Sequence, residues 1–225
     1  MSRHYPGWRP GLWLMLCFAV LAGCAKKKPL PPVPPAPVAA RPGSVIQRGL
    51  ASWYGRPYHG RRAADGEIYD METMVAAHRT LPFQTWLRVR NVGNGKSVDV
   101  RIIDRGPFVG NRIIDLSHAA AGQIDLIGPG VAEVELTVIS VPAAVGAGAF
   151  GVQVGAFQDR VNADRNLAAM RRAYGSATLI ERAGSPVLYR VLAGREPSPE
   201  AAEKLAERIR NEQNTRQAFV VRLDP

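Results

Sequence analysis

The sequence has little cysteine and no cluster of metal-binding residues. Its 225 residues include two cysteines, Cys17 and Cys24, and four histidines. His59, His78 and His118 are isolated from one another, whereas zinc sites use three or four ligands at short spacing. A metal ion is therefore not expected, and we expect the protein to work without a cofactor.

The motifs of several common enzyme classes are also missing. There is no G-x-S-x-G, and Ser52 and Ser97 have no special context, which argues against acyl transfer by a serine nucleophile. A phosphate-binding loop is absent as well. What remains is carboxylate chemistry, in which one acid protonates a leaving oxygen and its neighbours tune its pKa.

The positive charge is unevenly spread along the chain. The net charge of +10 would by itself be typical of binding to nucleic acid or to an anionic surface. However, residues 24–48 carry five basic residues and no acid, while residues 49–141 carry ten of each sign. Because no folded segment has a strongly basic face, nucleic-acid binding is not expected.

Residues 1–23 have the features of a bacterial lipoprotein signal peptide. Two arginines precede the apolar run Leu12–Leu21, which is too short for a comfortable membrane span. Small residues then lead directly to Cys24, as in a lipobox, which predicts a lipidated Cys24; an ordinary secretory signal with a chance cysteine is the alternative. Ala25 follows instead of Asp, and by resemblance to sorting in Gram-negative bacteria this favours the outer membrane.

The rest of the chain divides into a tether and a first folded unit. Residues 24–48 hold the proline-rich stretch PLPPVPPAPVAARP, which favours an extended spacer. Residues 49–141 are rich in alternating and β-branched runs, and Asn94-Gly95 is a hairpin signal. The predicted strands cover 49–54, 73–77, 85–91, 97–104 and 131–141, and a short helix capped by Ser117 covers 116–124. Many short strands with Gly and Pro turns predict a small barrel or sandwich.

A second linker, residues 142–149, precedes a different pattern over residues 150–225. The predicted strands cover 150–157, 178–182, 187–193 and 218–223, and the predicted helices cover 159–174 and 199–212. Ser198 followed by Pro199 is a good start for the second helix. The order βαββαβ predicts a small α+β domain with one sheet and two helices.

Two polar residues lie where a predicted strand meets a loop. Asp104 ends an apolar strand before Arg-Gly-Pro, and His78 follows the strand-like MVAA. A rigid scaffold holds catalytic groups at such places. Structural roles remain the alternative, because an Asp before Arg-Gly-Pro commonly caps a turn and a His after a strand is often a packed edge residue.

At these residues the sequence resembles a known family. Residues 49–140, which include GLASWYG, GEIYDM, AAHRTLPF and DRGPF, closely resemble the rare lipoprotein A family of septal-ring lytic transglycosylases. Residues 150–223 resemble the SPOR domain in VQVGAF, NADRNLAAM and YRVLAG. The resemblance implies a mainly β unit, a six-stranded double-psi β-barrel, followed by the small α+β SPOR domain.

The resemblance also implies a reaction. The family cleaves the β-1,4 bond between N-acetylmuramic acid and N-acetylglucosamine in peptidoglycan strands that lack stem peptides. The muramyl 6-hydroxyl attacks its own anomeric carbon and leaves a 1,6-anhydro end, so one acid/base suffices. By resemblance Asp104 is that acid/base and His78 is its close partner. Glu67 and Asp70 are the supporting carboxylates, which would bind sugar or hold the pKa of Asp104 up by like charge.

The sequence departs from the family pattern in three places, and one alternative function stays open. Ala63-Ala64-Asp65-Gly66-Glu67 stands where the family usually has Thr-Ala-Asn-Gly-Glu. Ile103 stands where the family usually has Asn, and Gln84 stands where it usually has Gly. A non-catalytic, expansin-like peptidoglycan-binding protein is the alternative to a lytic transglycosylase.

The SPOR likeness predicts a sugar-binding sheet face. Strand alternation places Gln153 opposite to Val152 and Val154, and we expect Gln153, Phe157 and Arg190 to contact glycan, with Phe157 in the core as the alternative. The expected partners are peptidoglycan, the membrane through the lipid, and divisome proteins. The expected location is the periplasmic side of the outer membrane, enriched at the division septum.

Overall fold

A computed structural model describes residues 42–142, 148–182, 186–215 and 217–223 of the chain. The predicted signal peptide, Cys24 and the proline-rich stretch lie outside the described residues. Among those that are described, no helix is long and apolar enough to cross a membrane.

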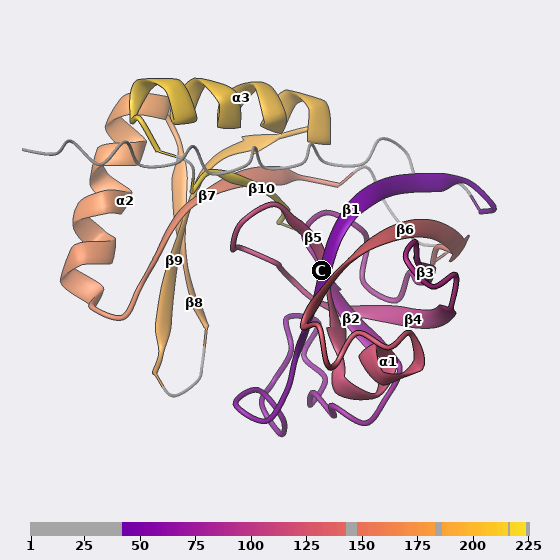
Figure 1. The fold of residues 1–225 in the computed structure, drawn as a ribbon. Helices are drawn as coiled ribbons and strands as arrows, with labels where there is room; N and C mark the ends of the chain where they lie inside the picture. The colour runs from indigo at the N-terminus through magenta and orange to yellow at the C-terminus, as the bar shows by residue number, and fades with distance from the viewer. Residues whose placement is uncertain (1–41, 143–147, 183–185, 216, 224–225) are drawn as a thin grey trace, which may run out of the picture.

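The first unit is a closed barrel of six strands (Figure 1). The strands follow the barrel in the order β1-β5-β2-β4-β3-β6. Two neighbouring pairs, β1 with β5 and β2 with β4, are parallel, and the other pairs are antiparallel. The strands are β1 (Val45–Tyr54), β2 (Val75–His78), β3 (Trp86–Asn91), β4 (Ser97–Asp104), β5 (Arg112–Ser117) and β6 (Val131–Ser140). The expected six-stranded barrel is confirmed.

Alternation of apolar and polar residues fills this barrel. In β3, Leu87 and Val89 are fully buried, whereas Trp86, Arg88 and Arg90 point outward. Successive side chains of a strand point to opposite faces, so one face of each strand supplies the core. The buried cluster also takes side chains from the other five strands and from the short helix α1 (His118–Gln123).

Two parts of the barrel differ from the sequence-based expectation. Strand β1 begins at Val45 and not at residue 49, because its first residues pair with the distant β6. Strand β5 was not predicted, since its run RIIDLS was divided between a loop and the helix that follows. Ser117 ends β5 and caps α1, accepting a hydrogen bond from the Ala120 amide at 3.2 Å.

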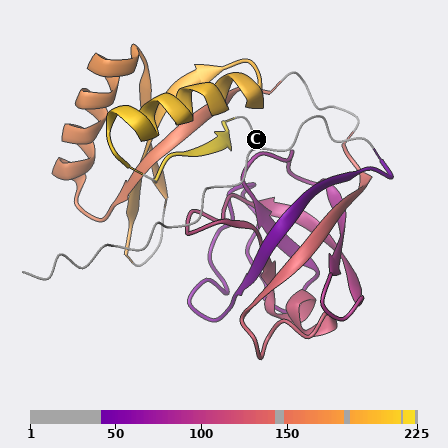
Figure 2. The ribbon, with the colours of Figure 1, turned by 45° about the horizontal axis from the view of Figure 1, so that its top comes forward.

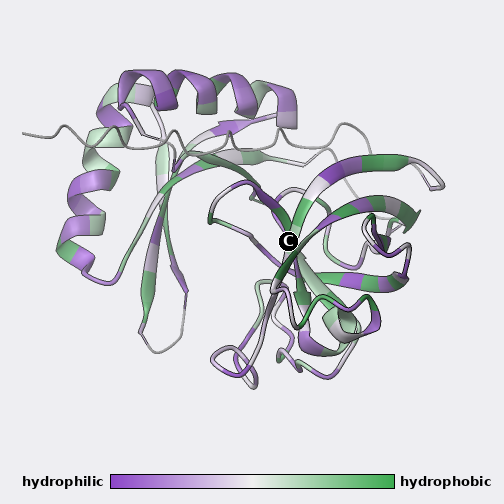
Figure 3. Cartoon of the chain, viewed as in Figure 1, coloured by the Kyte–Doolittle hydropathy of each residue, from purple (hydrophilic) through white to green (hydrophobic). Residues whose placement is uncertain are grey.

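The second unit is a four-stranded antiparallel sheet with two helices. Its elements are β7 (Phe150–Phe157), α2 (Arg160–Tyr174), β8 (Ala177–Arg182), β9 (Leu188–Glu196), α3 (Pro199–Glu212) and β10 (Phe219–Arg222). The expected βαββαβ order is confirmed. Both helices cover one face of the sheet, and their outer surfaces are hydrophilic (Figures 2 and 3).

The other face of this sheet is turned toward the barrel (Figure 1). The loop after β4 brings Phe108 edge-on to Phe219 of β10, with 6.1 Å between the ring centroids. The amide of Arg222, also on β10, donates to the carbonyl of Arg79 at 3.0 Å. The barrel loops after β2 and β4 therefore form the contact with the second domain.

Candidate active site

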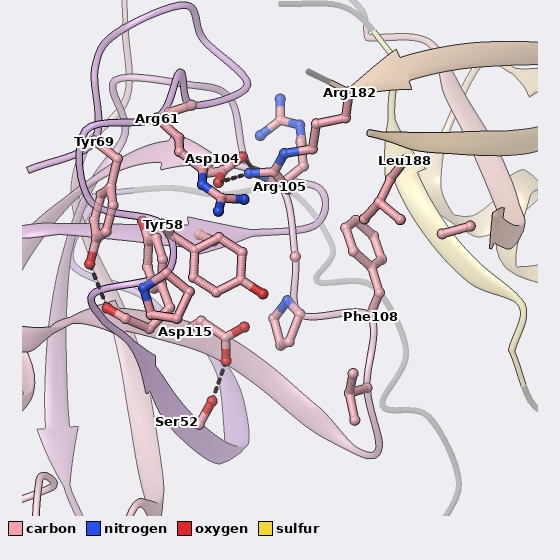
Figure 4. A pocket seen from close by; sticks show the side chains of 18 of the residues that line it. Ser52, Tyr58, Arg61, Tyr69, Asp104, Arg105, Phe108, Asp115, Arg182 and Leu188 are labelled. Carbon is pink, nitrogen blue, oxygen red and sulfur yellow. Dashed lines mark hydrogen bonds and ion pairs between the residues drawn. The ribbon is translucent and has the colours of Figure 1, made fainter. Parts of the chain in front are cut away.

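A cavity of about 1060 Å³ lies where the barrel meets the second domain (Figure 4). Its barrel side includes the ends of β1, β2, β4 and β5 and the loops that follow β1 and β4, and its other side is the open face of the second sheet. Seven arginines but only three carboxylates line it. The cavity is thus strongly cationic, although the barrel sequence is neutral overall.

Two of the lining carboxylates, Asp104 and Asp115, lie in one row across the barrel wall. Asp104 of β4 is the cross-strand partner of Ala77 on β2, and Ala77 is in turn the partner of Asp115 on β5. Asp115 is next paired with Ser52 on β1. Four neighbouring strands therefore place two carboxyl groups on the cavity wall, separated by the small side chain of Ala77.

A β-bulge positions Asp104. Ile102 pairs with Ala76 and Asp104 with Ala77, so Ile103 is an extra residue in β4. Such a bulge re-aims the side chains beside it. The side chain of Ile103 is buried in a small cluster with Ala63, Tyr69 and Val75, away from the barrel core. The apolar side chain of Ile103, where asparagine was the expected residue, therefore adds to this apolar cluster.

The two oxygens of Asp104 have different partners. Oδ1 accepts hydrogen bonds from the backbone amides of Ala64 at 3.1 Å and Arg105 at 2.8 Å. Oδ2 accepts from the guanidinium of Arg182, at the end of β8 in the second domain, at 2.6 Å (Figure 4). The carboxylate is held by the barrel through one oxygen and by the second domain through the other, and only 4% of Asp104 is exposed.

Asp115 is a cavity carboxylate that the sequence reasoning missed. Its Oδ1 accepts a hydrogen bond from the Ser52 hydroxyl, and Arg112 lies 3.6 Å away. Burial raises the pKa of Asp115, and the neighbouring Asp104 acts in the same direction more weakly. The signal that could have found it is the second RIID of the sequence, since RIIDRG carries Asp104 and RIIDLS carries Asp115.

Three tyrosines form an aromatic wall of the same cavity. Tyr54 and Tyr69 stack with 4.2 Å between centroids, and Tyr58 meets Tyr54 edge-on at 5.9 Å. The Tyr69 hydroxyl donates to the Tyr54 carbonyl at 2.6 Å. The Tyr54 hydroxyl is buried and has no hydrogen-bond partner among the described residues. Burial raises the pKa of Tyr54 far above its usual range, and the charge of Asp104 acts in the same direction. The phenol therefore keeps its proton and can donate a hydrogen bond to a bound ligand.

Contrary to expectation, His78 does not line the cavity, and no hydrogen bond joins it to Asp104 among the described residues. Its Nδ1 accepts hydrogen bonds from the amides of Thr80 and Leu81, at 3.2 and 3.1 Å, and its Nε2 lies 3.1 Å from Gln47 Oε1. This pattern requires the neutral tautomer with the proton on Nε2. Burial lowers the pKa of His78 well below its usual value, which agrees with a neutral ring. Strand alternation explains why His78 does not line the cavity. The neighbouring Ala77 faces the cavity, so the next side chain along β2 takes the opposite face.

His78 holds the loop after β2, which contacts the end of β4. The carbonyl of Leu81, in that loop, accepts a hydrogen bond from the Arg105 guanidinium at 2.9 Å. The same guanidinium lies over the ring of Phe83, at 3.6 Å from the centroid. Because the Arg105 amide donates to Asp104, hydrogen bonds link His78 through this loop to the end of β4.

Glu67 and Asp70 also lie outside the row of cavity carboxylates. Glu67 forms a bidentate ion pair with Arg101, at 2.7 and 2.8 Å, and this pairing lowers the pKa of Glu67. Asp70 caps a turn by accepting from the Glu72 amide, and it lies 3.6 Å from His59. Neither residue is among those that line the cavity. The second carboxyl group of the row next to Asp104 is instead that of Asp115.

Gln84 has a backbone conformation that favours glycine. Its backbone has φ of 65°, a left-handed conformation that costs a residue with a side chain about 1 kcal/mol. Its side-chain amide donates to Asp65 at 3.0 Å and to Glu67 at 3.2 Å, and its carbonyl accepts from Arg101 at 2.6 Å. These bonds offset the strain. They also connect the loop around Asp65, whose Ala64 amide donates to Asp104, to Arg101 on the barrel wall.

The second domain contributes part of the expected sugar-binding face. Gln153 and Arg190 lie on the sheet face toward the barrel, line the cavity, and are hydrogen-bonded to each other. Phe157 instead packs against the core between sheet and helices, so its expected place on the sugar face was wrong. The cause is an irregularity in register between Gln153 and Gly155, which resets the alternation along β7.

The barrel covers the centre of that face. The guanidinium of Arg190 lies 4.3 Å from the ring centroid of Phe108, which is on the loop after Asp104. As a result, Gln153, Arg190 and Phe219 are 4%, 7% and 4% exposed. Burial lowers the pKa of Arg190 to about 10. The second domain therefore covers the candidate acid Asp104, and the barrel covers the candidate sugar-binding face of the second domain.

No group of three or more His, Cys, Asp or Glu is placed to hold a metal ion in the described parts of the chain. The site consists of two carboxyl groups, a tyrosine wall and arginines. Such a set can transfer a proton and bind polar or anionic groups.

Comparisons with known proteins agree with this architecture. Residues 46–136 match the family model described as "Lytic transglycolase", and residues 146–222 match the "SPOR domain" model. The fold and site thus define a lytic-transglycosylase-type double-psi β-barrel joined to a SPOR domain.

Within this class, the barrel is similar to proteins of the rare lipoprotein A (RlpA) family. It is 55% identical over 91 residues to the endolytic peptidoglycan transglycosylase RlpA of Campylobacter jejuni, which covers 40% of this chain and 33% of that protein. It is 49% identical over 104 residues to the protein of the same name from Vibrio cholerae, covering 46% and 40%. These matches span well under half of the length of the relatives.

Among solved structures, a Clavibacter michiganensis expansin in complex with cellohexaose matches 49% of this chain and 58% of its own, with 19% identity and a TM-score of 0.35.

Proposed function

We propose that this protein is an endolytic lytic transglycosylase, a carbon–oxygen lyase that cleaves peptidoglycan strands lacking stem peptides. The observation that carries the proposal is the pair Asp104 and Asp115 on one cavity wall. The barrel fixes Asp104 through Oδ1 and turns Oδ2 into the cavity, where a substrate would lie. The names of the barrel's relatives support the same reaction.

The proposed step needs one acid/base. Protonated Asp104 gives its proton to the 4-oxygen of N-acetylglucosamine as the bond from that oxygen to the muramyl anomeric carbon breaks. The 6-hydroxyl oxygen of the same muramyl residue bonds to the anomeric carbon, and its proton passes to the Asp104 carboxylate. The products are a free 4-hydroxyl and a 1,6-anhydro end, no water is added, and Asp104 returns to its starting state.

Neighbouring groups support Asp104 in this proposal. Asp115, whose pKa is raised by burial, places a second carboxyl group beside it without requiring two charges in a buried site. The Tyr54 hydroxyl can donate to a sugar oxygen, and the exposed ring of Tyr58, which meets Tyr54 edge-on, offers an apolar face to a sugar ring.

The location is part of the proposal. The SPOR domain supports binding to peptidoglycan at the division septum, with Gln153 and Arg190 on the sugar side. The lipobox-like sequence before Cys24 supports a lipid anchor in the outer membrane, with the folded domains in the periplasm. Divisome proteins are the proposed protein partners.

The test uses the full chain in detergent with peptidoglycan sacculi that an amidase has stripped of stem peptides. Mass spectrometry should detect fragments with 1,6-anhydro ends, and Asp104→Asn should reduce their rate of formation by at least about a hundredfold. The matched control is Asp99→Asn, because Asp99 is exposed on the same strand and pairs with Arg88. If the wild type gives no product where an established transglycosylase does, the non-catalytic, expansin-like alternative takes its place.

A further inference from the structure

Arg182 is the second domain's contact with the candidate acid. It ends β8, and its guanidinium reaches across the cavity to Oδ2 of Asp104 (Figure 4). The Asp104 side chain is 5% exposed, whereas that of Arg182 is 29% exposed. The ion pair is therefore sealed on the barrel side and open on the cavity side.

This contact uses the oxygen that the reaction needs. Oδ1 is held by two backbone amides of the barrel, and only Oδ2 is directed toward the cavity. A charge-assisted hydrogen bond of 2.6 Å occupies Oδ2, so this oxygen cannot also donate a proton to a glycosidic oxygen. Substrate binding must therefore move Arg182 away from Asp104.

The excess of arginine around the cavity indicates what can move it. Seven arginines face three carboxylates there, which attracts an anion to the cavity. Peptidoglycan without stem peptides carries such an anion, because removing the peptide from the muramyl lactyl group leaves a free carboxylate. In a strand with stem peptides, the same carbonyl is part of a neutral amide.

We propose that Arg182 is a specificity-determining residue that exchanges its ion pair with Asp104 for an ion pair with the lactyl carboxylate of a peptide-free strand. This inference rests on the proposed function, and it assigns both the recognition of the substrate and the release of the acid to one arginine. The exchange replaces one ion pair by another and leaves no guanidinium unpaired, and the released Asp104 carboxylate takes a proton from solvent before it acts as the acid. A neutral amide cannot take the place of Asp104, so a strand with stem peptides leaves the acid covered.

The experiment separates charge from the bulk of the peptide. One substrate is amidase-treated glycan with free lactyl carboxylates, and the other is the same glycan after carbodiimide coupling to methylamine, which converts each carboxylate to a neutral amide. We expect the wild type to cleave the carboxylate form with a kcat/KM at least about tenfold higher, as one charge-assisted hydrogen bond implies.

Variants of Arg182 should change that preference. In Arg182→Gln, kcat/KM should fall on the carboxylate form and rise above wild type on the amide form, because Oδ2 is then uncovered without an exchange. Arg182→Lys should keep part of the preference. The control is Arg195→Gln, an exposed arginine of the same sheet, which should keep the wild-type ratio. The proposal is overturned if Arg182→Gln keeps the wild-type ratio of kcat/KM on the carboxylate form to kcat/KM on the amide form, which includes an equal loss of activity on both forms.

A binding measurement decides the role of Arg182 independently of cleavage. Fluorescently labelled strands of both forms are titrated with two proteins, the single variant Asp104→Asn and the double variant that also carries Arg182→Gln. The single variant should bind the carboxylate form more tightly than wild type does, because Arg182 no longer pairs with Asp104, and the double variant should lose the preference. Absence of cleavage by the wild type, together with an Arg182-dependent binding preference, would reject the transglycosylase but keep the assignment. Equal preference in the single and double variants would reject the assignment even for an active enzyme.

Discussion

Asp104 and Asp115 are both cross-strand partners of Ala77, from opposite sides of β2. The spacing between the two carboxyl groups is therefore fixed by backbone pairing across three strands. Such rigid placement suits a site in which one carboxyl group must change its protonation state while its neighbour does not.

The raised pKa of Asp115 should appear in the pH dependence of stability. The folded protein binds the Asp115 proton more tightly than the unfolded chain does, so the free energy of unfolding should fall as pH rises from about 4 to the raised pKa of the folded state. Asp115→Asn, which mimics the protonated acid, should remove this slope. Urea unfolding of both proteins between pH 3.5 and 7 measures the difference, and parallel curves would contradict the assignment.

The two stacked tyrosines should respond differently to loss of the hydroxyl group. Tyr54→Phe removes a buried hydroxyl without a described partner, so stability should be unchanged or higher, while cleavage of peptide-free strands should slow on the order of tenfold. Tyr69→Phe removes a donor to the Tyr54 carbonyl and should lower the free energy of unfolding by about 1 kcal/mol. Thermal unfolding and the sacculus assay distinguish the two; full activity of Tyr54→Phe would exclude a role in substrate binding.

His78 should affect stability with the opposite pH dependence to Asp115. Its pKa is lowered in the folded state by burial and by the nearby positive charges of Arg79 and Arg105, so the unfolded chain takes up a proton first. Stability should therefore fall as pH drops below about 6.5, the usual value for histidine. His78→Gln should lose this slope, whereas a substitution at the exposed His59 should keep it. A shift in the pH optimum of cleavage without a change in stability would instead favour a direct catalytic role.

Gln84 allows backbone strain and hydrogen bonding to be measured separately. Gln84→Ala loses the bonds to Asp65, Glu67 and Arg101 but keeps the left-handed backbone, whereas Gln84→Gly loses the same bonds and relieves the strain. The glycine variant should be more stable than the alanine variant by about 1 kcal/mol. Chemical denaturation of the three proteins gives the difference directly, and equal stability of both variants would show that the position carries no strain.

Local sequence patterns predicted much of the fold. The alternation in TWLRVRN and the Ser198-Pro199 start of α3 both identify elements that the structure contains. Strand β5 was missed because a short apolar run flanked by turn residues resembles the start of a buried helix. The early start of β1 depends on pairing with β6, which no local pattern reveals.

The candidate site was predictable only in part. Asp104 was found because a polar residue ends an apolar strand, but Asp115 was hidden in the strand that was missed. Both register irregularities, at Ile103 and between Gln153 and Gly155, change which face a side chain takes, and so Phe157 was misplaced. The pairing of Asp104 with Arg182 joins two domains, and no spacing within either domain encodes it.

The reciprocal contact, in which Arg182 lies on Asp104 while Phe108 lies on the sheet of the second domain, affects how pieces of this protein will behave. Each domain hides a working surface of the other, so separating the domains exposes both surfaces at once. On the proposed function, an isolated barrel would lose the preference for strands with a free lactyl carboxylate, and an isolated SPOR domain would bind glycan more tightly than it does in the whole chain. Measurements on the separate halves would therefore overstate the affinity of the SPOR domain and miss the substrate preference of the intact protein.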